Sequence, residues 1–137
     1  IRSQEVTDAV SEVSAVPEVR ELLVSLQRKA VEDSDFGIVI EGRDIGTVVL
    51  PDSALKVFLT ASPQARATRR SREVNPDADQ AQIARTRESI EIRDTKDSGR
   101  EYSPLKPALD AQILDTSDLT LEAVVEQLVD LVRNTYT

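Results

Sequence analysis

Three short apolar runs, separated by longer stretches with helical spacing, constrain the fold of this chain most strongly. Runs at 37–41, 55–60 and 111–114 have the length and apolar character of buried strands. Elsewhere apolar residues recur every three or four positions, a spacing typical of helices. This spacing, together with the proline and cap signals, predicts helices over 4–16, 17–33, 63–74, 78–97 and 121–132. Strands that alternate with helices predict an α/β fold, a parallel sheet flanked by helices.

Composition limits the chemistry that the chain can perform. Its 137 residues, 39% of them hydrophobic, suffice for one domain with a core. Cysteine and histidine are absent, which excludes a thiol nucleophile, an imidazole base and a typical zinc site. Carboxylates, arginines, lysines, hydroxyls or an oxygen-bound metal must therefore carry any reaction. No apolar run reaches the roughly 18 residues of a membrane span, so we expect a cytoplasmic protein without a membrane partner.

Charge is unevenly distributed along the chain. The net charge is -8, yet residues 66–100 hold nine of the 17 basic residues and only seven of the 25 acidic ones. A nucleic-acid-binding protein usually presents a broad basic face, whereas one arginine-rich segment in an acidic protein suits a small anionic ligand. We therefore expect no nucleic-acid partner.

The end of the first apolar run brings together side chains suited to a small anionic base. Glu41, Arg43 and Asp44 follow the run directly, and ligands of open α/β sheets bind at such strand ends. An arginine fork can hold a phosphate, and an aspartate can accept from an amine. The simpler alternative is an ion pair at a turn.

Two arginine groups could bind phosphates at either end of a helical hairpin. Arg66, Arg69 and Arg70 lie on the first of its helices. Residues 93–100, which hold two arginines, a lysine and two aspartates, lie at the end of the second helix. Arginine suits phosphate because its planar group donates two hydrogen bonds and stays charged. A solvated charged helix face is the alternative.

The runs 42–51, 55–59 and 65–70 closely resemble bacterial cytidylate kinases, and 1–6, 17–20 and 93–97 agree as well. The resemblance covers essentially the whole chain. It implies a P-loop nucleoside monophosphate kinase fold, and phosphoryl transfer from ATP to CMP or dCMP with Mg2+. A monomer is expected.

The resemblance also implies a CMP site. Residues that match Ser11, Arg20 and Asp44 would recognise cytosine, because its amine needs an acceptor while its ring nitrogen and carbonyl need donors. Arginines would hold the CMP phosphate or border the base, with Arg2 as a further candidate, and Asp97 would meet the sugar. The complete set is Arg2, Ser11, Arg20, Arg43, Asp44, Arg93, Asp97 and Arg100.

The hairpin arginines match those of the lid that closes over ATP in this family. The resemblance implies that Arg66 and Arg70 bind ATP. It implies that Arg66, Arg69, Arg70 and Arg93 stabilise charge on the transferred phosphoryl group. No residue is assigned to a metal.

One element expected of such a kinase is missing from the sequence. The chain holds no Gly-x-x-x-x-Gly-Lys-Ser/Thr motif, which in this family follows the first strand. We therefore expect a single-domain fragment whose first strand and phosphate loop precede Ile1, and which is inactive in isolation. Its parts would be helices on the monophosphate side (1–36), core strands (37–62), lid and arginine-rich helices (63–100), and a closing strand and helix (101–137).

Two other functions remain open at the level of the sequence. One is a different small-molecule kinase of the same fold, acting for instance on uridylate or shikimate. The other is a nucleotide-binding module without catalysis.

Overall fold

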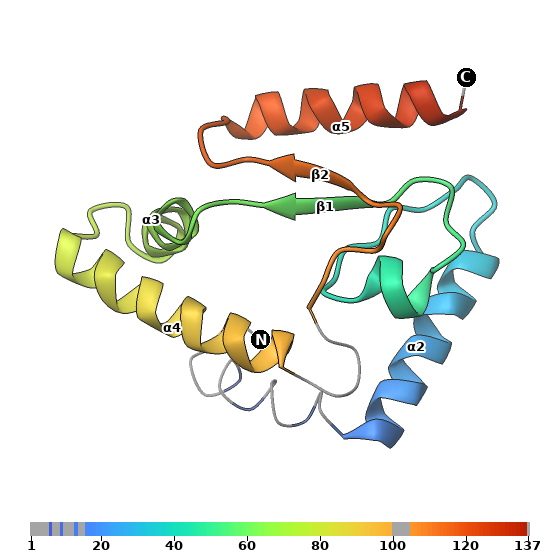
Figure 1. Ribbon diagram of the computed structural model, residues 1–137, viewed down its shortest axis with the longest axis horizontal. Coiled ribbons are helices and arrows are strands. Elements are labelled where there is room, and N and C mark those ends of the chain that lie inside the picture. Colours follow the sequence, from blue (N-terminus) through green and yellow to red (C-terminus); the bar gives the residue numbers. More distant parts are fainter. Residues whose placement is uncertain (1–5, 7–8, 10–12, 14–15, 100–104, 137) are drawn as a thin grey trace.

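The computed structural model describes residues 6, 9, 13, 16–99 and 105–136. A two-stranded parallel sheet lies at its centre, formed by β1 (Val57–Thr60) and β2 (Gln112–Asp115). Helix α5 (Leu121–Tyr136) lies alongside β2, while α3 (Pro63–Val74) and α4 (Gln80–Ser98) form a hairpin on the other side of the strands (Figure 1). The α/β class expected from the sequence is therefore confirmed.

The two strands pair in the parallel orientation that the sequence predicts. Val57 lies opposite Gln112, and the register continues to Thr60 opposite Asp115. The backbone N–H of Thr116 donates to the carbonyl of Thr60 at 2.8 Å, which extends the pairing beyond β2. Parallel strands require a long crossover connection, and the α3–α4 hairpin supplies it.

The strand expected over 37–41 does not form. Among the described residues, no backbone segment forms hydrogen bonds to residues 38–42, and Val39 is 94% exposed. A strand needs a neighbour for its backbone groups, and neither open edge of the β1–β2 sheet pairs with this run among the described residues. The chain instead enters a π-helix, η1 (Ile45–Val49), which the sequence did not predict.

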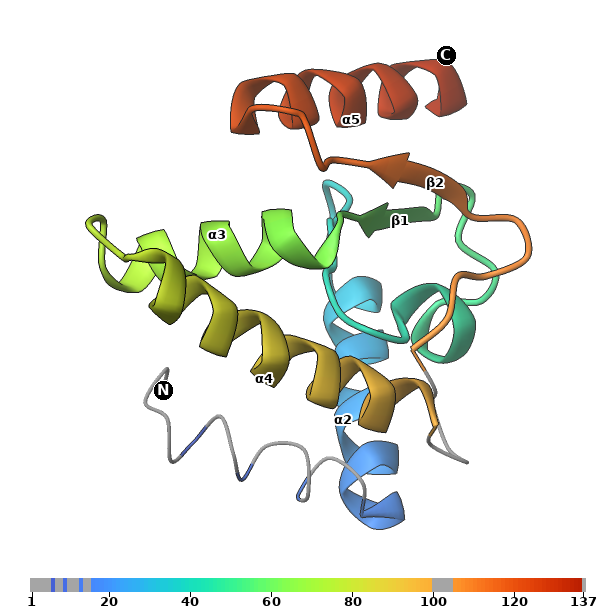
Figure 2. The same ribbon diagram turned by 60° about the vertical axis from the view of Figure 1, so that its left-hand side comes forward.

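The hairpin begins and turns where local signals place it. The hydroxyl of Ser62 accepts from the N–H of Ala65 at 3.2 Å, directly before the proline that starts α3. Asp79 forms a reciprocal capping box with Gln82 at the start of α4. Figure 2 shows the two helices side by side. Their contact buries Ala67 and Ile83, so the hairpin forms part of the small core.

Helix α2 (Pro17–Glu32) holds the turn at η1. Arg28 donates from Nε to the carbonyl of Val49 and from Nη2 to that of Val48, both at 2.8 Å. These bonds satisfy two carbonyls in a short π-helix, and the side chain of Val49 is fully buried beside them. The turn that carries Arg43 and Asp44 is thereby fixed against α2.

The helix expected over 4–16 falls mostly outside the described residues; Val6, Ala9 and Val13 within it are helical. Within the part of the chain that the structure describes, no helix is both long and apolar enough to cross a membrane.

Candidate functional site

A pair of opposite charges joins α2 to the turn before η1. Asp44 is 6% exposed, and its Oδ2 accepts a hydrogen bond from Nη2 of Arg20. Within the described part of the chain, Oδ1 of Asp44 and the buried Nε of Arg20 have no hydrogen-bond partner. Oδ1 of Asp44 is thus the acceptor that the pair leaves for a polar ligand.

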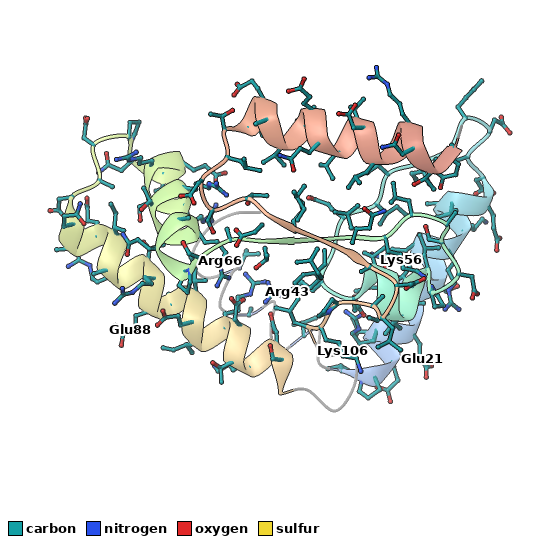
Figure 3. All side chains as sticks on the ribbon, turned by 45° about the horizontal axis from the view of Figure 1, so that its top comes forward. Glu21, Arg43, Lys56, Arg66, Glu88 and Lys106 are labelled. Atoms are coloured by element: carbon teal, nitrogen blue, oxygen red, sulfur yellow. The ribbon has the colours of Figure 1, made fainter. Side chains whose placement is uncertain are left out.

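A second group of charges, the arginine cluster, consists of Arg43, Arg66 and Arg93 with Asp94 and Asp97, and Arg43 is next to Asp44 in the sequence. Arg43 donates from Nη2 to Oδ1 of Asp94 at 2.8 Å, and its Nε lies 2.6 Å from Oδ2 of Asp97. Arg66 donates from Nη1 to Oδ2 of Asp94, and Nε of Arg93 lies 3.8 Å from Oδ2 of Asp97. Figure 3 shows Arg43 and Arg66 close together on the side of α4 that faces the strands, with Glu88 pointing away.

The electrostatics of the arginine cluster favour an added anion. Burial opposes the ionised form of Asp94, but hydrogen bonds from Arg66 and Arg43 outweigh it and hold the pKa of Asp94 below its ordinary value. Among the described residues, three guanidinium groups face two carboxylates, of which Asp97 is 1% exposed. The excess positive charge is what a phosphate-binding group requires.

The three arginines expected in the lid take different partners. Only Arg66 enters the arginine cluster. Arg69 donates to Oγ1 of Thr116 at 3.0 Å, to the carbonyl of Thr116, and to that of Leu119 at 3.2 Å. Arg70 pairs with Glu73 at 3.0 Å on an exposed face. Of these three arginines, the structure therefore places Arg66 in the cluster that is expected to bind phosphate.

The predicted CMP-site residues separate into two described groups. Arg20 and Asp44 form the first, and Arg43, Arg93 and Asp97 belong to the arginine cluster. Residues 43 and 44 are consecutive, so the turn before η1 carries one member of each group. The remaining candidates lie outside the described residues: Arg2, Ser11 and Arg100.

Sequence reasoning assigned no role to Asp94, although it accepts from two of the arginines. The available signal was its position, three residues before Asp97 and next to Arg93 on one helix. It also assigned none to Arg28, which positions the turn.

The described residues contain no group of three or more carboxylates that could hold a metal ion. Mg2+ in phosphoryl-transfer sites usually takes one or two protein carboxylates, water and the phosphates of the substrate. An ion that enters together with ATP is thus compatible with this arrangement.

The chain was compared with models of known protein families. A family model for cytidylate kinase matches residues 1–134. The α/β architecture therefore belongs to the P-loop nucleoside monophosphate kinases.

Individual relatives agree with the family model. Cytidylate kinases of Streptomyces griseus and Streptomyces avermitilis are each 57% identical to this chain over 133 residues, 97% of the chain and 56% of either relative. That of Nocardia farcinica is 51% identical over 128 residues, covering 93% of the chain and 55% of the relative. This chain belongs to the cytidylate kinase family. It spans a little over half the length of the curated relatives that it matches.

Proposed function

We propose that the protein containing this chain transfers the γ-phosphoryl group of ATP to CMP or dCMP, giving CDP or dCDP. The observation that carries the proposal is that one turn supplies Asp44 to the Arg20–Asp44 pair and Arg43 to the arginine cluster, in a member of the cytidylate kinase family. The pair offers polar groups to a base, and the cluster offers positive charge to a phosphate. A monomer that works in the cytoplasm is part of the same proposal.

Cytosine recognition would use both members of the pair. Oδ1 of Asp44 accepts from the exocyclic amine of cytosine, while Arg20, together with Ser11, donates to the ring nitrogen and carbonyl. Uracil presents a carbonyl where cytosine has its amine, so two acceptors would face each other. The arrangement thus supports a preference for CMP over UMP.

The arginine cluster would hold the monophosphate. Arg43 and Arg93 bind CMP phosphate oxygens, assisted by Arg100 and Arg2, while Asp97 meets the sugar. The hydrogen bond of Arg43 to Asp94 and its ion pair with Asp97 orient its guanidinium group before the substrate arrives, and Arg93 lies within ion-pair distance of the same Asp97. Such preorganisation avoids reorienting charged side chains during the reaction.

The helix α3 would serve the ATP side. Arg66 and Arg70 bind the ATP phosphates, and Arg69 acts with Arg66 and Arg93 on charge that develops on the transferred phosphoryl group. Arg66 already donates to Asp94 within the arginine cluster, which supports its place between donor and acceptor. Mg2+ bound with ATP would supply further neutralisation of the phosphate charge.

The test is a coupled assay of ADP release by the complete protein with CMP, dCMP, UMP, AMP and shikimate. We expect turnover of CMP and dCMP, with UMP and AMP at least about tenfold slower in kcat/KM. Equal turnover of UMP and CMP would remove the base-recognition argument. Tight CMP binding with no turnover of any acceptor would instead support a nucleotide-binding module.

A further inference from the structure

Asp94 links three segments that are distant in the sequence. It lies on α4, and its two carboxylate oxygens accept from different arginines. Arg43, 51 residues earlier, belongs to the turn before η1, and Arg66, 28 residues earlier, belongs to α3. One carboxylate thus determines how two guanidinium groups lie relative to each other.

Each of these arginines is fixed along part of its guanidinium group. Arg43 uses Nη2 and Nε for Asp94 and Asp97, and Arg66 uses Nη1 for Asp94 and Nε for the carbonyl of Ala61 at 3.2 Å. Within the described segments, Nη1 of Arg43 and Nη2 of Arg66 form no hydrogen bond. Both groups therefore keep a donor for a ligand while their planes are held.

We propose that Asp94 is a positioning residue for phosphoryl transfer, holding Arg43 on the acceptor side and Arg66 on the donor side at a fixed separation. This inference rests on the proposed function. In-line transfer requires the acceptor phosphate and the γ-phosphate of ATP to lie close together, so the arginines that bind them must be placed as a unit. An error of about 1 Å in such placement lowers the rate by up to about a hundredfold.

The first test compares Asp94→Asn with wild type in the complete protein, using CMP and ATP. The substitution preserves size but replaces one acceptor with a donor, which repels one of the two arginines. We expect kcat to fall by about tenfold to a hundredfold. The matched control is Asp130→Asn, since Asp130 also faces an arginine, Arg133 at 3.6 Å, on exposed α5. Its kcat should stay within about twofold of wild type.

A double-mutant cycle separates positioning from a purely structural role. If Asp94 acts partly through Arg66, then Asp94→Asn should lower kcat less in an Arg66→Ala background than in wild type, because only its effect on Arg43 is left. If Asp94 only stabilises the fold, the fold-losses in kcat from Asp94→Asn and Arg66→Ala should multiply in the double variant. Asp94→Glu provides a second variant, because it keeps the negative charge that the arginines require but displaces the carboxylate. We expect it to melt near the wild-type temperature and still lose kcat.

The outcomes distinguish the two proposals. If wild type phosphorylates no nucleoside monophosphate, the proposed function fails and this inference fails with it. If wild type phosphorylates CMP while Asp94→Asn behaves like Asp130→Asn, only the role of Asp94 is overturned. Additive losses in the cycle overturn it as well. If Asp94→Asn does not fold, Asp94→Glu decides, and wild-type kcat in that variant rejects the inference.

Discussion

Arg69 donates hydrogen bonds to both the hydroxyl and the carbonyl oxygen of Thr116, the residue that follows β2. Thr116 is itself buried, and its hydroxyl donates to the carbonyl of Thr60 at 3.0 Å. Arg69 therefore ties α3 to the carboxyl ends of both strands. This link holds α3 against the end of the sheet.

Replacing Arg69 by alanine should destabilise the protein. The variant leaves acceptors of Thr116 and Leu119 without their charged donor, so we expect the free energy of unfolding to fall by about 1 to 2 kcal/mol. Arg70→Ala on the same helix removes only an exposed pair with Glu73 and should change it by about 0.5 kcal/mol or less. Urea unfolding measures both. Equal stability of the two variants would contradict the structural role of Arg69.

Local signals in the sequence predicted most helices and two strands. Pro17 and the Ser62-Pro63 pair predicted helix starts correctly. Proline at a first helical position and a serine cap act on the neighbouring backbone, so the sequence alone reveals them. The run at 37–41 was wrongly predicted as a strand, since strand formation also needs a partner that the run itself does not specify. No signal in the neighbouring sequence indicated η1. Two of its carbonyls accept hydrogen bonds from Arg28, which lies about 20 residues away in the sequence.

The sequence predicted only part of the candidate site. Resemblance to a family placed Arg20 with Asp44, and the structure pairs them. The link from Arg66 to Arg43 through Asp94 was not predictable, because it depends on how α3 and α4 pack against the turn. Ion pairs over such separations leave no periodic signal in a sequence.

Replacing Arg28 by alanine should loosen the turn that carries the proposed base site. The carbonyls of Val48 and Val49 lose their donors, and we expect the free energy of unfolding to fall by about 1 to 3 kcal/mol. CMP affinity should fall too, because Asp44 directly precedes η1. The control is Lys29→Ala, one position along α2. Calorimetric titration with CMP and urea unfolding compare the two variants. Unchanged CMP affinity in Arg28→Ala would contradict a role of Arg28 in positioning the turn.

Replacing Asp44 by asparagine should affect both stability and base preference. Arg20 would lose its buried counter-charge, which we expect to lower the free energy of unfolding by about 1 to 3 kcal/mol. An amide can also donate to the uracil carbonyl, so the ratio of kcat/KM for CMP over UMP should fall by at least about tenfold. Asp52→Asn, in an exposed loop, serves as the control. A variant that keeps the wild-type ratio would reject Asp44 as the cytosine acceptor.

Lowering the pH should reduce the stabilisation that Asp94 gains from its ion pairs with Arg43 and Arg66. The pKa of Asp94 lies below its ordinary value of 3.8, so the unfolded chain takes up the proton first as pH falls. The stabilisation is therefore fully present above that ordinary value and is lost as pH falls through the lower pKa of the folded state. Urea unfolding of wild type and Asp94→Asn between about pH 2 and 7 should show a difference that shrinks towards acid. A difference that grows on acidification would contradict the ion pairs.

The apolar run that fails to form a strand leaves a hydrophobic surface on the 137-residue chain. Phe36 is 100% exposed, and Leu59 of β1 and Ile113 of β2 are also exposed, whereas the buried apolar residues are few. Exposed apolar side chains bind hydrophobic dyes. We expect the isolated chain to enhance anilinonaphthalene sulfonate fluorescence strongly. The variant Val39→Ser should reduce that signal without lowering the melting temperature, because the side chain of Val39 makes few contacts to lose. Dye binding no greater than that of a compact reference protein would contradict the exposure of this surface.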